Sequence, residues 1–258
     1  MSDLQVKNTS TQLQVYTDLD VFGAASEVTA SDVQMPSVIL MQDNSSFVKD
    51  RTNDIKGGDF VNSVTEEVIG NAFGEPLELV VVDMFKTEVI SEANGKDWIS
   101  TKPWTPAHES LPYEDHIDGV SVIRQKCFNY VCFRPLEVRE VSTPGGPQYV
   151  ASPLIVKMKG ASGKFGKKFN QTLKDMADFR QPSWSTTFKL TGSEETNEKG
   201  TFFVWEFKKG EQTIKEVQIA AYNMCKMSQE ARKAGNMEVI DAEESEKRTV
   251  RNVADEIY

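Results

Sequence analysis

The chain has 258 residues and a mass of 28.9 kDa. Its 39 acidic residues against 29 Lys and Arg give a formal net charge of −10, and 39% of its residues are hydrophobic. With the 16 glycines added, the apolar share is about 45%, enough for a buried core, so wholesale disorder is excluded. No apolar run approaches the ~18 residues of a membrane span, and residues 1–30 lack a basic start and an apolar stretch. We therefore expect neither membrane insertion nor secretion.

Charge is distributed unevenly along the chain. Residues 1–119 have a net charge of −14, residues 120–190 have +8 and residues 191–258 have −4. A basic block in an acidic chain is typical of a polyanion partner, of a tail that masks a basic surface, or of both. The three cysteines, Cys127, Cys132 and Cys225, are odd in number and form no disulfide framework, which favours a reducing interior.

The first 35 residues are rich in Ser, Thr, Asp and Gln, and we expect a flexible arm over 1–35 with a candidate strand at 15–21. Further along, short runs of β-branched and aromatic residues between turn residues predict strands. These runs lie at 37–41, 58–70 (two short strands), 77–85, 120–123, 128–134, 148–159, 184–190 and 201–208, the last two as a long hairpin. Residues 91–119 have no period and predict a long loop, and 144–147 predict a turn.

Two segments have helical periodicity. Phe165, Phe169, Leu173 and Met176 recur every three or four residues over 163–178, and a second apolar face runs along 215–234. Consecutive strands with few helices predict a β-rich α+β domain over 36–227. Its architecture is an OB-like, partly open barrel or a curled antiparallel sheet with one or two helices.

The segment 228–258 is predicted to contain the end of the second helix and a disordered acidic tail. Its last 21 residues have seven acids against three bases, and their apolar residues are isolated. The chain ends in Asp255, Glu256, Ile257 and Tyr258, so that acids stand directly before an apolar and an aromatic residue.

The strongest functional signal is a basic–aromatic region in the middle of the chain. Cations neutralise phosphates, and flat rings accept exposed bases at ~1–3 kcal/mol per base, so the two together predict binding of single-stranded nucleic acid. The candidate phosphate contacts are Lys157, Lys159, Lys164, Lys167, Lys168, Lys189 and Arg134. A subset of Tyr130, Phe133, Trp184, Phe188 and Trp205 is expected to stack on bases. For each ring taken alone, burial in the core is the favoured alternative.

Other kinds of site are poorly supported. The glycines and lysines of 160–168 do not have the spacing of a Walker-type phosphate loop, because Met158 and Lys168 stand where the motif needs Gly and Ser or Thr. The one candidate zinc set does not have the usual closely spaced pairs, so buried thiols and loop histidines are the favoured interpretation. That set is His108, His116, Cys127 and Cys132. With two histidines and no Gly-x-Ser-x-Gly, we expect no enzyme, metal site or cofactor.

Three segments resemble a known family. Gly58-Asp-Phe-Val-Asn-Ser-Val-Thr-Glu-Glu-Val-Ile-Gly70 resembles the G-D-F-x-N-S-x-T-G-E-x-x-G segment of a group of phage proteins usually described as single-stranded-DNA-binding. Residues 152–169 resemble their strand leading into a Lys-rich helix, and residues 196–205 resemble their next hairpin. The resemblance covers about 36–227 in patches and has no catalytic fingerprint. It implies a DNA-binding protein of the phage-infected cell.

The chain departs from this family at two points. Glu66 stands where the family has Gly, and the cysteine-rich loop of several relatives is reduced to Cys127 and Cys132, which removes most of any inherited metal site. The acidic end resembles that of replicative single-strand-binding proteins, which close on an aromatic residue. This resemblance implies that Asp255–Tyr258 occupies the basic groove when DNA is absent and engages partner proteins when DNA binds.

The sequence thus predicts a protein of the host cytoplasm in a phage-infected bacterium. It would coat replication or recombination intermediates without strong sequence preference, and its tail would contact replication or transcription proteins. Two alternatives remain open: a virion or assembly protein, and a transcription adaptor that recruits a polymerase to single-stranded DNA. A homodimer, the size of the binding site, and DNA-versus-RNA preference also remain open.

Overall fold

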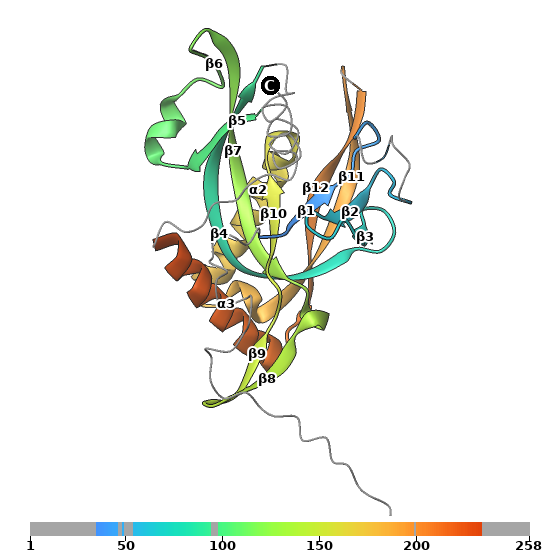
Figure 1. The fold of residues 1–258 in the computed structure, drawn as a ribbon, viewed down its shortest axis with the longest axis vertical. Helices are drawn as coiled ribbons and strands as arrows, with labels where there is room; N and C mark the ends of the chain where they lie inside the picture. The colour runs from blue at the N-terminus through green and yellow to red at the C-terminus, as the bar shows by residue number, and fades with distance from the viewer. Residues whose placement is uncertain (1–34, 46–47, 49–53, 94–97, 199, 234–258) are drawn as a thin grey trace, which may run out of the picture.

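The computed structural model describes residues 35–45, 48, 54–93, 98–198 and 200–233 (Figure 1). Residues 1–34 of the predicted flexible N-terminal segment and the acidic tail, including Asp255–Tyr258, lie outside these residues. The strands are β1 (Ser37–Leu40), β2 (Asp59–Asn62), β3 (Val68–Asn71), β4 (Leu77–Glu92), β5 (Trp98–Pro103), β6 (Glu114–Ile117), β7 (Val120–Phe133), β8 (Arg139–Thr143), β9 (Gly146–Val150), β10 (Leu154–Met158), β11 (Thr186–Asn197) and β12 (Gly200–Gln212). The helices are α2 (Gly163–Asp178) and α3 (Lys215–Lys233), with short 3-10 turns η4 (Pro106–Ser110), η5 (Pro135–Glu137), η6 (Gly160–Ser162) and η7 (Ser183–Ser185).

Ten strands form one mixed sheet within the described residues, and eight of them follow the order β12-β11-β4-β7-β10-β1-β2-β3. All neighbours are antiparallel except β1 and β10, which run parallel. The two longest partners, β4 and β7, extend beyond this path as a ribbon, where β5 pairs with β4 and β6 pairs with β7. We call this four-stranded extension the arm; it rises at the upper left of Figure 1.

The two helices cover opposite faces of the sheet. α2 buries Phe169 and Met176 against a cluster on one face, which includes Leu79, Tyr130 and Val156. α3 buries its apolar side against the other face, among residues that include Val131. The alternation of side chains along each strand therefore supplies both cores, because consecutive residues face opposite helices.

The sheet curls around α2, and its edges β3 and β12 do not pair with each other in the described residues, so it is not closed. Side chains instead join the β12 edge to the start of the sheet. The amide of Gln42 accepts a hydrogen bond from the Phe203 backbone N–H (2.8 Å) and donates one to the Phe203 carbonyl (3.1 Å). Ser162 accepts one from the backbone N–H of Trp205, whose ring stacks on Phe60 with centroids 5.3 Å apart.

The predicted β-rich domain, with a curled sheet and two helices, is confirmed, although the sheet is mixed rather than antiparallel. Its OB-like character remains a prediction. The long loop predicted over 91–119 is wrong for much of that range, which contains β5, η4 and β6. These strands are short and polar, and they form because the β4–β7 ribbon offers two free edges for pairing.

Candidate nucleic-acid interface

Helix α2 has one buried side and one lysine-rich side. Gly160, with φ +55°, turns the chain from β10 into η6, and α2 follows directly. The buried side presses Gly166 against the sheet so closely that a Cβ there would lie 2.7 Å from the Phe128 ring. The exposed side presents four lysines, which we call the α2 lysine face: Lys164, Lys167, Lys168 and Lys174.

The lysines of this face differ in their partners. Lys164 forms an ion pair with Glu195 of β11, and its ammonium lies 5.0 Å from the Phe165 ring centroid. Lys174 pairs with Asp178 at 2.6 Å, one turn further along, and this hydrogen bond raises the pKa of Lys174. Lys167 and Lys168 have no acidic partner among the described residues. These two ammonium groups can therefore bind an anion without first breaking an ion pair with a carboxylate.

Other predicted phosphate contacts lie elsewhere. Lys157 is opposite Asn129 on the α3 side of β10, because its neighbours Val156 and Met158 face α2. Lys189 is opposite Lys208 and points away from α2, since Phe188 and Leu190 on either side of it are in the α2 core. Arg134 is half-buried and pairs with Glu137 at 2.8 Å, and Lys159 is half-buried just before η6. Of the predicted phosphate contacts, Lys164, Lys167 and Lys168 therefore lie together on the α2 lysine face, whereas Lys157 and Lys189 point away from α2.

Four of the five candidate stacking rings are in the core. Tyr130 and Phe133 are 0% exposed, Phe188 is 1% exposed and Trp205 is 7% exposed. A ring without an open face cannot stack on a base, so the structure corrects the expectation for these four. Trp184 is half-buried against the α3 core.

Tyr130 shows what such a ring does instead. Its hydroxyl donates to the Gly166 carbonyl (3.0 Å) and reaches the Asn170 side chain (2.9 Å), which fixes α2 on the sheet. Burial raises the pKa of Tyr130 well above its ordinary value, so the hydroxyl stays protonated as a donor.

The arm adds basic and aromatic residues that the sequence analysis passed over. The Lys126 ammonium lies 4.3 Å from the Trp104 ring centroid and pairs with Glu109 of η4. This hydrogen bond lowers the pKa of Glu109. Tyr113, between η4 and β6, is 57% exposed. In the sequence, Trp104 and Tyr113 stand in the segment 91–119, which was predicted to be a loop. The sequence did not place them in a folded element because strand pairing there depends on the distant β4–β7 ribbon.

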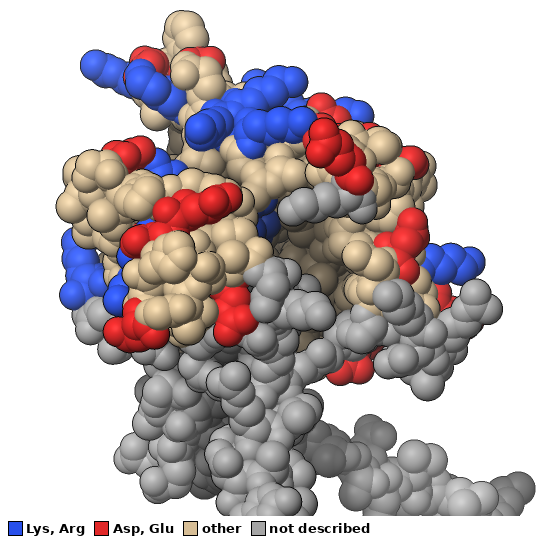
Figure 2. Space-filling view, turned by 90° about the horizontal axis from the view of Figure 1, so that it is seen from above, with Lys and Arg blue, Asp and Glu red and all other residues tan. Residues whose placement is uncertain are grey.

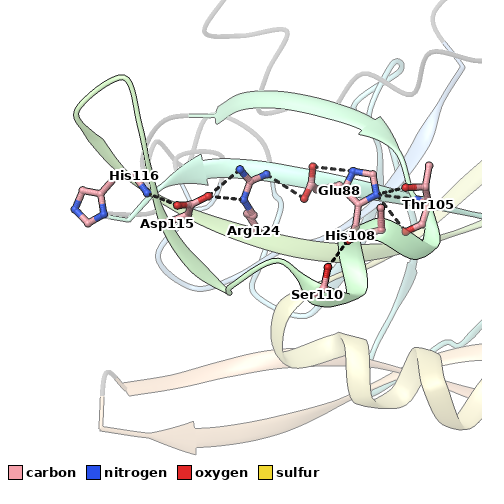
Figure 3. A network of polar contacts seen from close by, with 8 residues as sticks. Glu88, Thr105, His108, Ser110, Asp115, His116 and Arg124 are labelled. Carbon is pink, nitrogen blue, oxygen red and sulfur yellow. Dashed lines mark hydrogen bonds and ion pairs between the residues drawn. The ribbon is translucent and has the colours of Figure 1, made fainter.

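A polar network holds η4 on the arm (Figure 3). Glu88 is 2% exposed and contacts Arg124 Nη1 at 3.2 Å and His108 Nε2 at 3.4 Å. Arg124 also donates to Asp115 (2.9 Å), and His108 Nδ1 meets the Thr105 hydroxyl at 2.7 Å. The pKa of Asp115 is lowered, first by the backbone N–H of His116 and then by Arg124, whose own pKa is raised by the same pairing.

The residues of the candidate zinc set, which the sequence disfavoured, lie apart. His108 belongs to the polar network, His116 meets Ser121 at 3.0 Å, and Cys127, Cys132 and Cys225 are buried thiols that form no disulfide. Burial raises the pKa of Cys132. In the described ranges, no cluster of three or more His, Cys, Asp or Glu has the arrangement of a metal site.

The upper end of the molecule, as oriented in Figure 1, has a surface of mixed charge. Figure 2 looks down on this end of the molecule and shows Lys and Arg side chains gathered along one edge of a hollow, with Asp and Glu side chains on its flanks. An anionic chain that follows the basic edge would avoid the acidic flanks.

Neither described helix combines the length and the apolar character needed to cross a membrane.

Comparison with known proteins gives one family. The model described as Pam3 phage gp34-like protein matches residues 141–238. This range contains β9, β10, α2, β11, β12 and α3, and so the whole α2 lysine face, while the arm lies outside it. Searches of curated proteins and of solved structures returned no match. The chain is therefore similar to this phage protein family over residues 141–238.

Proposed function

We propose that this chain binds single-stranded DNA without strong sequence preference and coats replication or recombination intermediates in the cytoplasm of a phage-infected bacterium. The α2 lysine face is the observation on which the proposal rests. Its four ammonium groups lie along about 15 Å of one rigid helix, at 1.5 Å per residue, and two of them have no acidic partner in the described part of the chain. The similarity of residues 141–238 to a phage gp34-like family supports the phage-infected setting of this proposal.

The chemistry of the face favours backbone contacts over base readout. Lysine is a point charge on a flexible stem, which neutralises phosphate without selecting a base. The chain has a net charge of −10, so the rest of its surface repels DNA and directs the polyanion to the lysine face. Binding should therefore be strongly salt-dependent and tolerant of sequence.

The direct test replaces three lysines of the face by glutamine, K164Q/K167Q/K168Q, and measures the anisotropy of fluorescein-labelled oligo-dT. The dissociation constant at low salt should rise by roughly tenfold or more, since up to three phosphate contacts are lost. The matched control, K215Q/K226Q/K233Q, removes three exposed lysines of α3 on the other side of the sheet and should change it by less than about threefold. Equal effects of the two triple variants would refute the assignment to α2.

The proposal includes the tail. Asp255, Glu256, Ile257 and Tyr258 would compete with DNA for the lysine face and engage replication or transcription proteins once displaced. A chain ending at Glu238 should bind oligo-dT more tightly than the full chain at low salt, and the two should converge as salt screens the tail. Identical affinities at every salt concentration would remove the masking role.

A further inference from the structure

Tyr113 is an exposed aromatic residue held in a fixed position. Its side chain is 57% exposed, yet its backbone carbonyl accepts a hydrogen bond from the Arg124 N–H of β7 at 2.8 Å. Its hydroxyl accepts one from Gln125 Nε2 at 3.4 Å. Arg124 is itself held by Glu88 and Asp115. A solvent-exposed ring with this support loses little freedom when a flat partner packs on it.

The position of Tyr113 connects the arm to α2. The Gln125 amide that contacts its hydroxyl also lies beside Gly160, where a Cβ would be 3.6 Å from Nε2. Gly160 begins the turn that leads into α2, three residues before the helix and four before Lys164. One side chain therefore separates the Tyr113 hydroxyl from the start of the segment that bears the lysines.

We propose that Tyr113 stacks on an unpaired base of the strand whose phosphates lie on the α2 lysine face. This inference rests on the proposed function and adds the element that selects single strands. In a duplex both faces of each base are occupied by neighbouring bases, whereas a single strand can present a free face to the ring. Tyr113 takes the role that the buried rings Tyr130, Phe188 and Trp205 cannot fill.

The test compares two ligands with the same phosphates: labelled oligo-dT and an oligomer of equal length made of abasic sites. The full-length wild-type chain should bind oligo-dT about fivefold or more tightly than the abasic strand, the contribution of at least one stacked base. Y113L should bring this ratio close to one, and Y113F should preserve it because the ring remains. Y222L is the matched control, since Tyr222 is 49% exposed beside Lys226 but belongs to α3 on the other face.

The outcomes separate the two proposals. If the lysine triple variant weakens both ligands in parallel while Y113L leaves the ratio unchanged, phosphate binding stands and the role of Tyr113 is wrong. A wild-type ratio of one would also overturn it. If the wild-type chain binds neither ligand, the proposed function itself fails. Unchanged unfolding midpoints for Y113F and Y113L would show that the arm is still folded.

Discussion

Glu88 has a nearly fully buried carboxylate, and the arm compensates that burial with two partners, Arg124 and His108. A buried charge is tolerated when it is paired and hydrogen-bonded, and it is costly when a partner is removed. The network thus acts on folding: it fixes η4 and, through Arg124, the backbone of Tyr113.

The two partners should respond unequally to substitution. R124M leaves the Glu88 carboxylate buried with His108 alone, and should lower the free energy of unfolding by about 3–5 kcal/mol. E88Q leaves Arg124 paired with Asp115 and should cost only about 1–2 kcal/mol. Urea unfolding of both variants measures the difference. A larger cost for E88Q than for R124M would show that the guanidinium, rather than the carboxylate, is the group in need of compensation.

Glu66 has a backbone conformation that favours glycine. Its φ of 57° lies in the left-handed region. A residue with a Cβ is strained there by roughly 1–2 kcal/mol.

A glycine at this position should therefore raise the free energy of unfolding. E66G is expected to raise the free energy of unfolding by up to about 1 kcal/mol, because relief of strain exceeds the added freedom of the unfolded chain. E67G makes the same chemical change at the neighbouring residue, which has no positive φ, and should lower it by about 0.5–1 kcal/mol. Thermal unfolding of both proteins gives the signs, and the same sign for both would contradict the strain argument.

At the scale of elements, α2 is shaped by the sheet beneath it. Its interior glycine, Gly166, lowers helix propensity by about 1 kcal/mol relative to alanine, yet no larger residue fits there. The close approach brings Phe169 into stacking contact with Phe207, at 4.1 Å between centroids.

A pair of alanine substitutions tests this packing. G166A should destabilise the protein by about 1–3 kcal/mol despite the better helix former, because the new Cβ meets Phe128, Met158 and Tyr130. G163A, at the first position of the same helix with nothing within 4 Å of its Cβ, should be neutral or stabilising by up to about 1 kcal/mol. Chemical denaturation of both variants provides the comparison, and a stabilising G166A would mean that α2 sits further from the sheet.

Prediction from sequence succeeded where local patterns decide structure. The period of Phe165, Phe169 and Leu173 located α2, and runs of β-branched and aromatic residues located parts of β4, β7, β11 and β12. It failed for β5 and β6, whose pairing depends on a ribbon distant in sequence. In the candidate site, the helical pattern placed the lysines of α2 together. The alternation of side chains in β10 would also have shown that Lys157, between two core residues, points to the opposite side of the sheet from α2. Which rings are buried depends on which faces of the sheet α2 and α3 cover, and the local sequence pattern does not determine that.

For the whole molecule, the curl of the sheet is the decisive feature. It encloses α2, leaves the lysine face outside, and brings β12 near β1 and β2 without forming a ladder. Gln42 closes the gap by presenting its side-chain amide as a strand would present its backbone.

Removal of this side chain should loosen the closure. Q42A is expected to lower the free energy of unfolding by about 1–3 kcal/mol, since two groups on the β12 edge lose their partner. Hydrogen exchange of the Phe203 amide should accelerate, while exchange in the β4–β7 ribbon should change only as far as global stability does. Unchanged protection at Phe203 would show that the edge is closed by other contacts.

The central claim is that phosphates bind the α2 lysine face, and the salt dependence of affinity tests it most directly. The dissociation constant of the full chain for labelled oligo-dT would be measured from about 20 to 300 mM salt. A plot of log affinity against log salt should fall with a slope of about −0.7 for each phosphate contacted, so a slope between about −2 and −3 is predicted for three or four lysines. In K164Q/K167Q/K168Q the slope should become shallower by about 2. A flat plot for the wild-type chain, or an unchanged slope in the triple variant, would contradict the account.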